Sequence, residues 1–296
     1  MIEPTTQIGA DGFHCHPCFD EQAHERVGRV HLPVAPRCNI QCGYCVRLYD
    51  CVNESRPGVA SMVLTPEQAM ERVRAVVERD GRLGVVGVAG PGDPLANPET
   101  LRVLRMVDAE FPEVTLCLST NGLLLPEVID ELKRLHRLTL TVTVNALRPE
   151  TAAKIYRWAR YAGTTLHGRD AGRLMVERQW EGLRRAEEAG IVVKVNSVLV
   201  PDVNETEIPQ IAERAAACGV NVMNITPLIA QGEFAGVAPP TPKQIHAMRE
   251  RCAPHLPLIN HCRQCRSDAC GLLGEDRDME TETVLAQVGE EYCDNV

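Results

Sequence analysis

The sequence lacks three features that would assign it to common protein classes. It has no excess of positive charge, because its formal net charge is −9, and it therefore lacks the basic surface of a nucleic-acid-binding protein. It has no apolar run long enough to cross a bilayer, since stretches such as 190–201 are far shorter than about 20 residues. Its first residues, MIEPTTQIGADGF, contain no basic or apolar region of a secretory signal. We expect a cytoplasmic protein with no nucleic-acid and no membrane partner.

Cysteine, in contrast, is abundant and clustered. The 296 residues include 13 cysteines, and disulfides are rare in the cytoplasm. Thiols separated by two or three residues are typical of metal or iron–sulfur ligands. The clusters are Cys15 and Cys18; Cys38, Cys42, Cys45 and Cys51; and Cys262, Cys265 and Cys270. Isolated cysteines pack well in a core, and we expect that role for Cys218, Cys252 and Cys293.

From residue 31 onward, apolar strand-like segments alternate with amphipathic helical segments. Strands are indicated at 31–35, 82–90, 114–120, 138–146, 191–200 and 220–229. Helices are indicated at 65–80, 97–111, 125–135, 148–161, 171–189, 205–219 and 241–252, with a loop at 163–168. Six strand–helix units predict an α/β fold with a parallel sheet, either a partial (β/α)6 TIM-like barrel or an open doubly wound sheet. We expect an N-terminal extension at 1–29, the barrel at 30–253 and a cysteine-bearing C-terminal extension at 254–296.

Glycine-rich and polar segments follow the predicted strands. GVAGPGDP (87–94) follows the second strand, STNG (119–122) follows the third, and asparagines lie at or near the ends of later strands, at Asn145, Asn196 and Asn224. In parallel α/β barrels, chemistry gathers at the carboxyl ends of the strands. We therefore expect these segments to meet the first cysteine loop in one site.

Cys38-x3-Cys42-x2-Cys45 supplies three thiolates from one loop. In a [4Fe–4S] cluster, three cysteines hold three irons and leave the fourth open to another ligand. A closed zinc site requires four ligands, and Cys51 is available as the fourth. Zinc would leave the glycine-rich and Ser-Thr-Asn segments unexplained.

This motif, with Tyr44 before its last cysteine, resembles the cluster motif of radical S-adenosylmethionine (SAM) enzymes. The resemblance implies that SAM binds the open iron of a [4Fe–4S] cluster. It also implies contacts of the glycine-rich segment with the amino end of SAM, through Gly90, Pro91, Gly92 and Asp93, and of the next segment with its ribose and carboxylate, through Ser119, Thr120 and Asn121. Buried asparagines either hydrogen-bond SAM or are satisfied by the backbone, and this choice stays open for Asn145 and Asn196.

Further motifs, HPCF, DCVNESRPGV and CRQCRSDACGLLGED, resemble the NifB family over roughly residues 13–276. The resemblance implies fusion of two [4Fe–4S] clusters into an eight-iron, carbide-containing precursor of the nitrogenase cofactor. One SAM supplies the carbon and another the 5′-deoxyadenosyl radical. The implied partners are iron–sulfur cluster donors, cofactor carrier or scaffold proteins, and an electron donor such as ferredoxin or flavodoxin. Because the chain ends shortly after GLLGED, we expect it to lack the carrier-like domain of many members.

Position and resemblance divide the remaining thiols between two substrate clusters. One would be held by Cys18, Cys51 and Cys117, with a fourth ligand from Cys15, His16 or His24. The other would be held by Cys262 and Cys265, with Cys270 as a ligand or a buried bystander. Cys15-x2-Cys18 also fits half of a zinc knuckle.

Glu54 and Arg56 follow Cys51 directly in NESRPG. We expect Glu54 to accept protons as the methyl group becomes carbide, and Arg56 to balance the anionic clusters. A surface ion pair is the simpler alternative. Two other functions stay open: a radical SAM peptide-modifying enzyme with auxiliary clusters, and a non-catalytic iron–sulfur or zinc protein.

Overall fold

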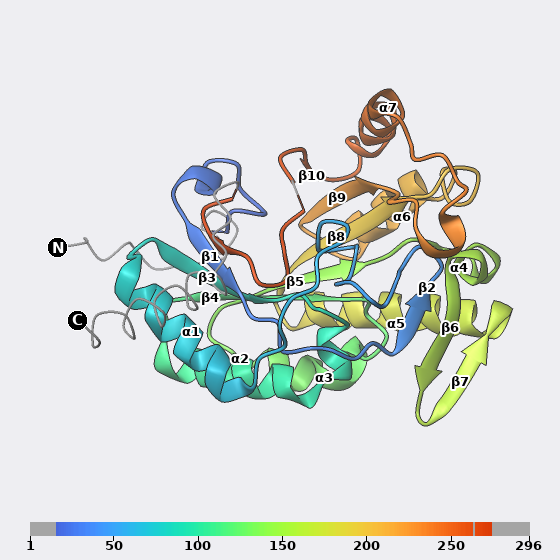
Figure 1. Ribbon diagram of the computed structural model, residues 1–296. Coiled ribbons are helices and arrows are strands. Elements are labelled where there is room, and N and C mark those ends of the chain that lie inside the picture. The colour runs from blue at the N-terminus through green and yellow to red at the C-terminus, as the bar shows by residue number, and fades with distance from the viewer. Residues whose placement is uncertain (1–15, 263, 274–296) are drawn as a thin grey trace, which may run out of the picture.

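A computed structural model describes residues 16–262 and 264–273 of the chain (Figure 1). Its main sheet contains six strands in chain order that are parallel to one another; five match the predicted strands, whereas the first lies at 28–31 and overlaps the predicted 31–35 at His31 only. These are β1 (Gly28–His31), β3 (Leu83–Val88), β4 (Thr115–Thr120), β5 (Leu138–Thr143), β8 (Val192–Leu199) and β9 (Val222–Pro227). A doubly wound sheet reverses its strand order at a switch point. The unbroken order here is that of a partial barrel, which confirms the predicted fold class.

Helices connect the strands and cover the sheet on its outer side (Figure 1). They are α1 (Pro66–Arg79), α2 (Pro98–Glu110), α3 (Leu125–Leu132), α4 (Pro149–Ile155), α5 (Gly168–Glu188), α6 (Ile208–Ala217) and α7 (Pro242–Cys252). Short 3-10 turns occur at η1 (Ala23–Glu25), η2 (Pro94–Ala96) and η3 (Gly232–Phe234). Thr65 precedes α1 and forms a full capping box with Gln68. Asn97 also precedes its helix, but its side chain makes no cap hydrogen bond.

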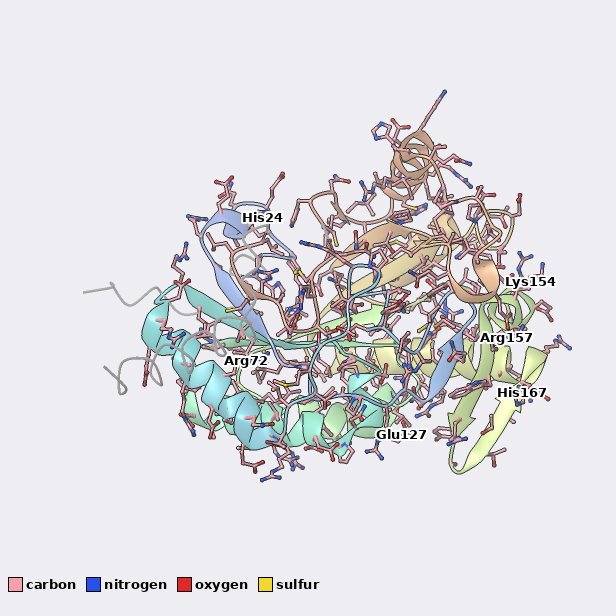
Figure 2. The ribbon with its side chains drawn as sticks, in the orientation of Figure 1. His24, Arg72, Glu127, Lys154, Arg157 and His167 are labelled. Atoms are coloured by element: carbon pink, nitrogen blue, oxygen red, sulfur yellow. The ribbon has the colours of Figure 1, made fainter. Side chains whose placement is uncertain are left out.

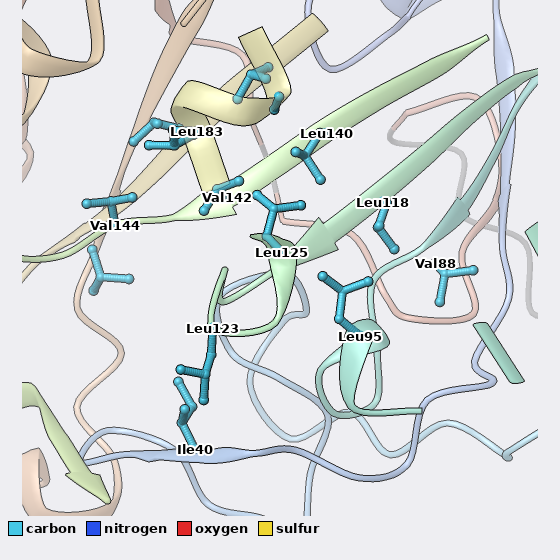
Figure 3. Packing of buried hydrophobic residues seen from close by; sticks show 14 of the residues in the cluster. Ile40, Val88, Leu95, Leu118, Leu123, Leu125, Leu140, Val142, Val144 and Leu183 are labelled. Atoms are coloured by element: carbon cyan, nitrogen blue, oxygen red, sulfur yellow. The ribbon is translucent and has the colours of Figure 1, made fainter. Parts of the chain in front are cut away.

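The core lies between the strands and this layer of helices (Figure 3). Leu118 and Leu140 from the strands and Leu125 and Leu183 from the helices are fully buried in one cluster. Burying such a side chain stabilises a fold by about 2 kcal/mol. The helical face of each unit therefore fixes its strand, and with it the position of the polar residues at the strand end.

The predicted helix at 148–161 is wrong in its second half. Residues beyond Ile155 form β6 (Tyr156–Tyr161), and the predicted loop contains β7 (Thr164–His167), so the two make an antiparallel hairpin. Its turn residues Ala162 and Gly163 have φ of 48° and 79°, as a two-residue hairpin turn requires. Aromatic and threonine residues favour strands, and pairing with β2 (Ile40–Cys42) outweighs the local helical pattern.

The C-terminal extension joins the two edges of the main sheet. Its first strand, β10 (Leu258–Ile259), pairs with β9, and its second, β11 (Cys270–Gly271), pairs antiparallel to β1. We call residues 258–262 and 264–271 the C-terminal strap; Figure 1 shows it in orange-red. Arg29 holds the β11 end, because its Nη1 donates to the carbonyls of Gly271 and Leu272 at 2.7 and 2.8 Å.

Candidate radical SAM site and its neighbouring pocket

The cysteine loop is held from outside by the hairpin. Its strand β2 pairs with β6. The Gly43 N–H donates to the Ile155 carbonyl at 2.7 Å, and the Arg160 N–H donates to the Asn39 carbonyl at 2.8 Å. The hairpin that the sequence did not reveal therefore fixes the backbone that carries the cysteines.

The first pocket lies inside this loop and encloses about 460 Å³. Its lining includes Cys38, Cys42, Cys45 and Cys51, together with Gly92, Asp93 and the Ser-Thr-Asn segment. Burial raises the pKa of Cys38 to about 12 and raises the pKa of Cys42 and Cys51 well above the usual range. Buried thiolates need a compensating cation. Three motif thiols in one pocket, short of charge compensation, fit an iron–sulfur cluster.

Asp93 joins the two loops that the sequence assigned to SAM. Its carboxylate accepts hydrogen bonds from the Thr120 hydroxyl at 2.9 Å, from the Asn121 N–H at 2.6 Å and from the Leu95 N–H at 3.0 Å. Burial raises the pKa of Asp93 to about 6. Its carboxylate thus positions the segment of Ser119, Thr120 and Asn121, and contact of these residues with SAM stays a prediction.

The glycine-rich segment lies directly against the cysteine loop. The Gly92 N–H donates to the Ala35 carbonyl, and a Cβ at Gly92 would overlap the Arg37 carbonyl oxygen. Asn97 adds a second connection, since its Nδ2 donates to the Arg37 carbonyl at 2.8 Å. Gly90 and Pro91 continue the same segment, and Pro91 pairs with Ala35 in an isolated bridge. Glycine at 92 is therefore required by the close approach of two backbones.

Two predicted SAM-binding asparagines are engaged by the protein itself. Asn145 donates from Nδ2 to the Tyr44 hydroxyl at 2.9 Å and accepts from the Val198 N–H at 2.8 Å. Asn196 donates to the Asn53 carbonyl at 3.3 Å and lines the second pocket rather than the first. The expected alternative of amides satisfied by the backbone describes both in part, since Asn145 also donates to a side chain. Their contact with SAM stays a prediction.

The second pocket encloses about 530 Å³ and borders the first. The two share part of their lining, namely Asn53, Glu54, Ala89 and Ser119. Four thiols from three separate segments line the second pocket: Cys18, Cys117, Cys262 and Cys265. Burial raises the pKa of Cys18 and Cys117, although the ammonium group of Lys194 lowers it in part. A site for one small molecule thus lies beside a site rich in sulfur ligands.

The structure distributes the remaining predicted ligands differently from the expected grouping. Cys51 lines the first pocket, whereas Cys18 and Cys117 lie with the C-terminal pair in the second. Cys270 is buried in β11 opposite Val30 and lines neither pocket. Cys15 lies outside the described residues. The division of these thiols between two substrate clusters stays a prediction.

Two histidines were candidates for a fourth ligand. His16 is buried, and its Nδ1 accepts from the Cys18 N–H at 3.0 Å. The ring proton therefore sits on Nε2, so in this conformation neither nitrogen offers a free lone pair. Burial lowers the pKa of His16 well below its usual value, which keeps the ring neutral. His24 packs edge-on against His261, with ring centroids 5.5 Å apart.

Glu54 and Arg56 contact different parts of the structure. Glu54 lines both pockets, and burial raises the pKa of its carboxyl group. Arg56 is exposed, and its Nε donates to the Gln264 carbonyl at 3.0 Å. Its backbone N–H donates to the Cys265 carbonyl, also at 3.0 Å. Glu54 is placed for chemistry between the pockets, whereas Arg56 binds the C-terminal strap.

Sequence reasoning missed two buried cations near these thiols. Arg29 Nη2 donates to Cys265 Sγ at 3.4 Å, and Lys194 lines the second pocket from β8. The available signal was a lysine inside the apolar run IVVKVNSVLV, because lysine is almost never fully buried without a partner. Among residues 16–262 and 264–273, no three His, Cys, Asp or Glu side chains lie close enough to hold a single metal ion.

Comparison with known proteins shows the family to which the chain belongs. The model of the radical SAM superfamily matches residues 32–215. The chain belongs to the radical SAM superfamily. Membership confirms the predicted class of enzyme and implies a [4Fe–4S] cluster and SAM, which the first pocket fits through Cys38, Cys42 and Cys45.

Among individual radical SAM proteins, the resemblance to NifB is confirmed. The chain is 46% identical over 282 residues to the FeMo cofactor biosynthesis protein NifB of Klebsiella pneumoniae, covering 93% of this chain and 60% of the relative. It is 40% identical over 275 residues to the NifB of Chlorobaculum tepidum, covering 92% and 65%. The chain thus spans less than two thirds of these relatives.

Solved structures support the radical SAM fold. A radical SAM methyltransferase from Sphaerobacter thermophilus matches with a TM-score of 0.50 at 18% identity, over 78% of this chain and 64% of that one. The methyltransferase TsrM from Kitasatospora setae, with tryptophan and a SAM analogue bound, also reaches 0.50, at 14% identity over 72% and 39%. Among the residues that the structure describes, no helix is long and apolar enough to span a membrane.

Proposed function

We propose that this radical SAM enzyme builds the eight-iron, carbide-containing precursor of the nitrogenase cofactor from two [4Fe–4S] substrate clusters. The observation that carries the proposal is the direct contact between the two pockets, which share Glu54 and three other residues. A molecule in the first pocket would meet a substrate in the second without leaving the protein. The similarity to NifB proteins supplies the identity of that substrate.

In the first pocket, Cys38, Cys42 and Cys45 would hold the resident [4Fe–4S] cluster, which binds SAM and supplies its reductive cleavage. The protein orients SAM with the two loops that Asp93 joins. Asn121 adds a connection to the cysteine loop, since its Nδ2 donates to Asn39 Oδ1 at 2.7 Å. These buried hydrogen bonds keep the loops in one arrangement, as the orientation of a bound reactant requires.

In the second pocket, four thiols from three segments would receive the iron–sulfur substrate. A methyl group transferred from SAM to a substrate sulfide must lose its hydrogens to become carbide. One leaves to the 5′-deoxyadenosyl radical, and the others leave as protons. Glu54 lies between the pockets, and burial raises the pKa of its carboxyl group, which suits it to accept such protons near neutral pH.

The proposed reaction requires several partners. Iron–sulfur donor proteins would load the second pocket, an electron donor such as ferredoxin or flavodoxin would reduce the resident cluster, and a carrier protein would take the product. Cys262 is exposed at the second pocket. That exposure favours exchange of a substrate cluster over permanent burial.

One observation favours a second candidate. The four thiols of the second pocket are enough to ligate one [4Fe–4S] cluster completely. A fully ligated cluster would be a fixture for electron transfer, as in a radical SAM enzyme that modifies a peptide. Iron content separates the two functions: about twelve irons per chain for two substrate clusters and about eight for one auxiliary cluster.

The proposal is tested by anaerobic reconstitution followed by addition of dithionite and SAM. We expect both 5′-deoxyadenosine and S-adenosylhomocysteine, the latter reporting methyl transfer. Cys42→Ala removes a ligand of the resident cluster and should abolish 5′-deoxyadenosine, while iron remains in the second pocket. Cys218→Ala, at the end of α6, is the matched control and should behave as the parent. Formation of 5′-deoxyadenosine without S-adenosylhomocysteine would favour the peptide-modifying alternative.

A further inference from the structure

Lys194 occupies an unusual position for a lysine. It lies within β8 and is only 8% exposed. In the sheet its Cα is paired with that of Thr141, another residue of the second pocket. Asn196, two residues further along the strand, also lines this pocket, as alternation along a strand requires. The ammonium group is therefore carried on the inward face of the sheet.

The ammonium group has no partner that accounts for its burial. Across residues 16–262 and 264–273, Lys194 takes part in no hydrogen bond and no ion pair; its Nζ lies 5.6 Å from the ring centroid of Phe19. Burying an unpaired ammonium group is costly. Arg29, the other buried cation near these thiols, donates to Gly271, Leu272 and Cys265 Sγ and does not line the pocket. Lys194 is thus the buried cation that lines the pocket itself.

The surroundings of Lys194 show which ligand it suits. Cys18, Glu54, Cys117 and Cys262 line the same pocket as Lys194. Thiolates around an iron–sulfur core make the whole cluster anionic, and its net charge is a main determinant of its properties. A fixed cation beside these thiols compensates that charge where water does not.

We propose that Lys194 is a substrate-binding residue whose ammonium group retains the anionic iron–sulfur cluster in the second pocket. This assignment rests on the proposed function and adds to it a residue that selects substrate by charge. It also explains why a destabilising buried lysine is present, since residues that bind substrates commonly reduce the stability of the empty protein.

The test isolates the second pocket by combining Cys38→Ala, Cys42→Ala and Cys45→Ala, so that the resident cluster is not held. In this background, Lys194→Met is compared with Lys194→Arg and with the matched control Lys154→Met, at an exposed lysine that Figure 2 shows at the edge of the molecule. Each protein is reconstituted anaerobically. The rate of iron loss to a chelator and the Tm of the iron-free protein are measured.

We expect Lys194→Met to lose iron at least about tenfold faster than its background, as for removal of one partner of a buried charged pair. Lys194→Arg should keep most of the iron, and Lys154→Met should match the background. The iron-free Lys194→Met protein should have a Tm equal to or above that of its background, because an uncompensated buried charge is removed.

Three outcomes would overturn the assignment. Unchanged iron loss in Lys194→Met would show that the ammonium group does not retain the cluster. Faster iron loss together with a lower Tm of the iron-free protein would show a structural role. A background protein that binds no iron would overturn the proposed function together with the assignment, whereas the first two outcomes leave the proposed function intact.

Discussion

Asp93 gives the clearest consequence of burial at the scale of single residues. Its folded-state pKa of about 6 exceeds the ordinary aspartate value because burial disfavours the charged form. The folded chain therefore binds more protons than the unfolded chain between about pH 4 and pH 6. The contribution of this carboxylate to stability falls as pH rises through that window.

This sign gives a prediction for Asp93→Asn in the cluster-free protein. From pH 4 to pH 6, the free energy of unfolding should decline by about 2 kcal/mol more in the parent than in the variant. Urea denaturation at several pH values measures this difference. Parallel pH profiles of parent and variant would show that the buried carboxyl group does not titrate in this window.

Glu54 gives a prediction about chemistry. Glu54→Gln keeps the size of the side chain at the junction of the pockets but removes the group that accepts protons. We expect iron content and S-adenosylhomocysteine formation to match the parent, while the eight-iron product forms about 100-fold more slowly. The control is Glu78→Gln, at an exposed position of α1. An unchanged rate of product formation in Glu54→Gln would remove Glu54 from the mechanism.

At the scale of elements, the site depends on loops that touch through their backbones. The strand ends, the cysteine motif and the glycine-rich segment were predictable, because spacing along the chain and strand polarity determine them. The hairpin was not predictable. The helical pattern of 148–161 is overridden by the pairing of β6 with β2, which is distant in sequence. For Asn145 the sequence left open SAM contact or burial within the protein, because its partners Tyr44 and Val198 are distant in sequence.

Gly92→Ala tests the contact between these loops. The added Cβ would overlap the Arg37 carbonyl oxygen, which is backbone and does not move aside without displacing the cysteine loop. We expect weaker SAM binding by at least about tenfold, measured by equilibrium dialysis of the reconstituted protein, as overpacking costs 1–3 kcal/mol, roughly. Gly81→Ala is the control, because no atom lies within 4 Å of its added Cβ. Equal SAM affinity in both variants would contradict the close approach.

At the scale of the whole molecule, the C-terminal strap completes the second pocket. It joins β9 to β1 through β10 and β11, and it brings Cys262 and Cys265 opposite Cys18 and Cys117. The hydroxyls of Ser55 and Ser267 lie 2.9 Å apart where the strap meets the loop after Cys51. The clusters of cysteine were visible in the sequence. Their assembly around Lys194 was not, because it depends on the strap that joins β9 to β1.

The central claim is that SAM in the first pocket acts on an iron–sulfur substrate in the second, and the fate of the SAM methyl carbon tests it most directly. The reconstituted protein is incubated anaerobically with dithionite and SAM labelled with 14C in its methyl group, and the iron-containing product is separated from small molecules. The 14C label should elute with iron in the parent and should not do so in Cys42→Ala or Cys117→Ala. Label recovered only in methionine and unreacted SAM, with 5′-deoxyadenosine still formed, would contradict the central claim.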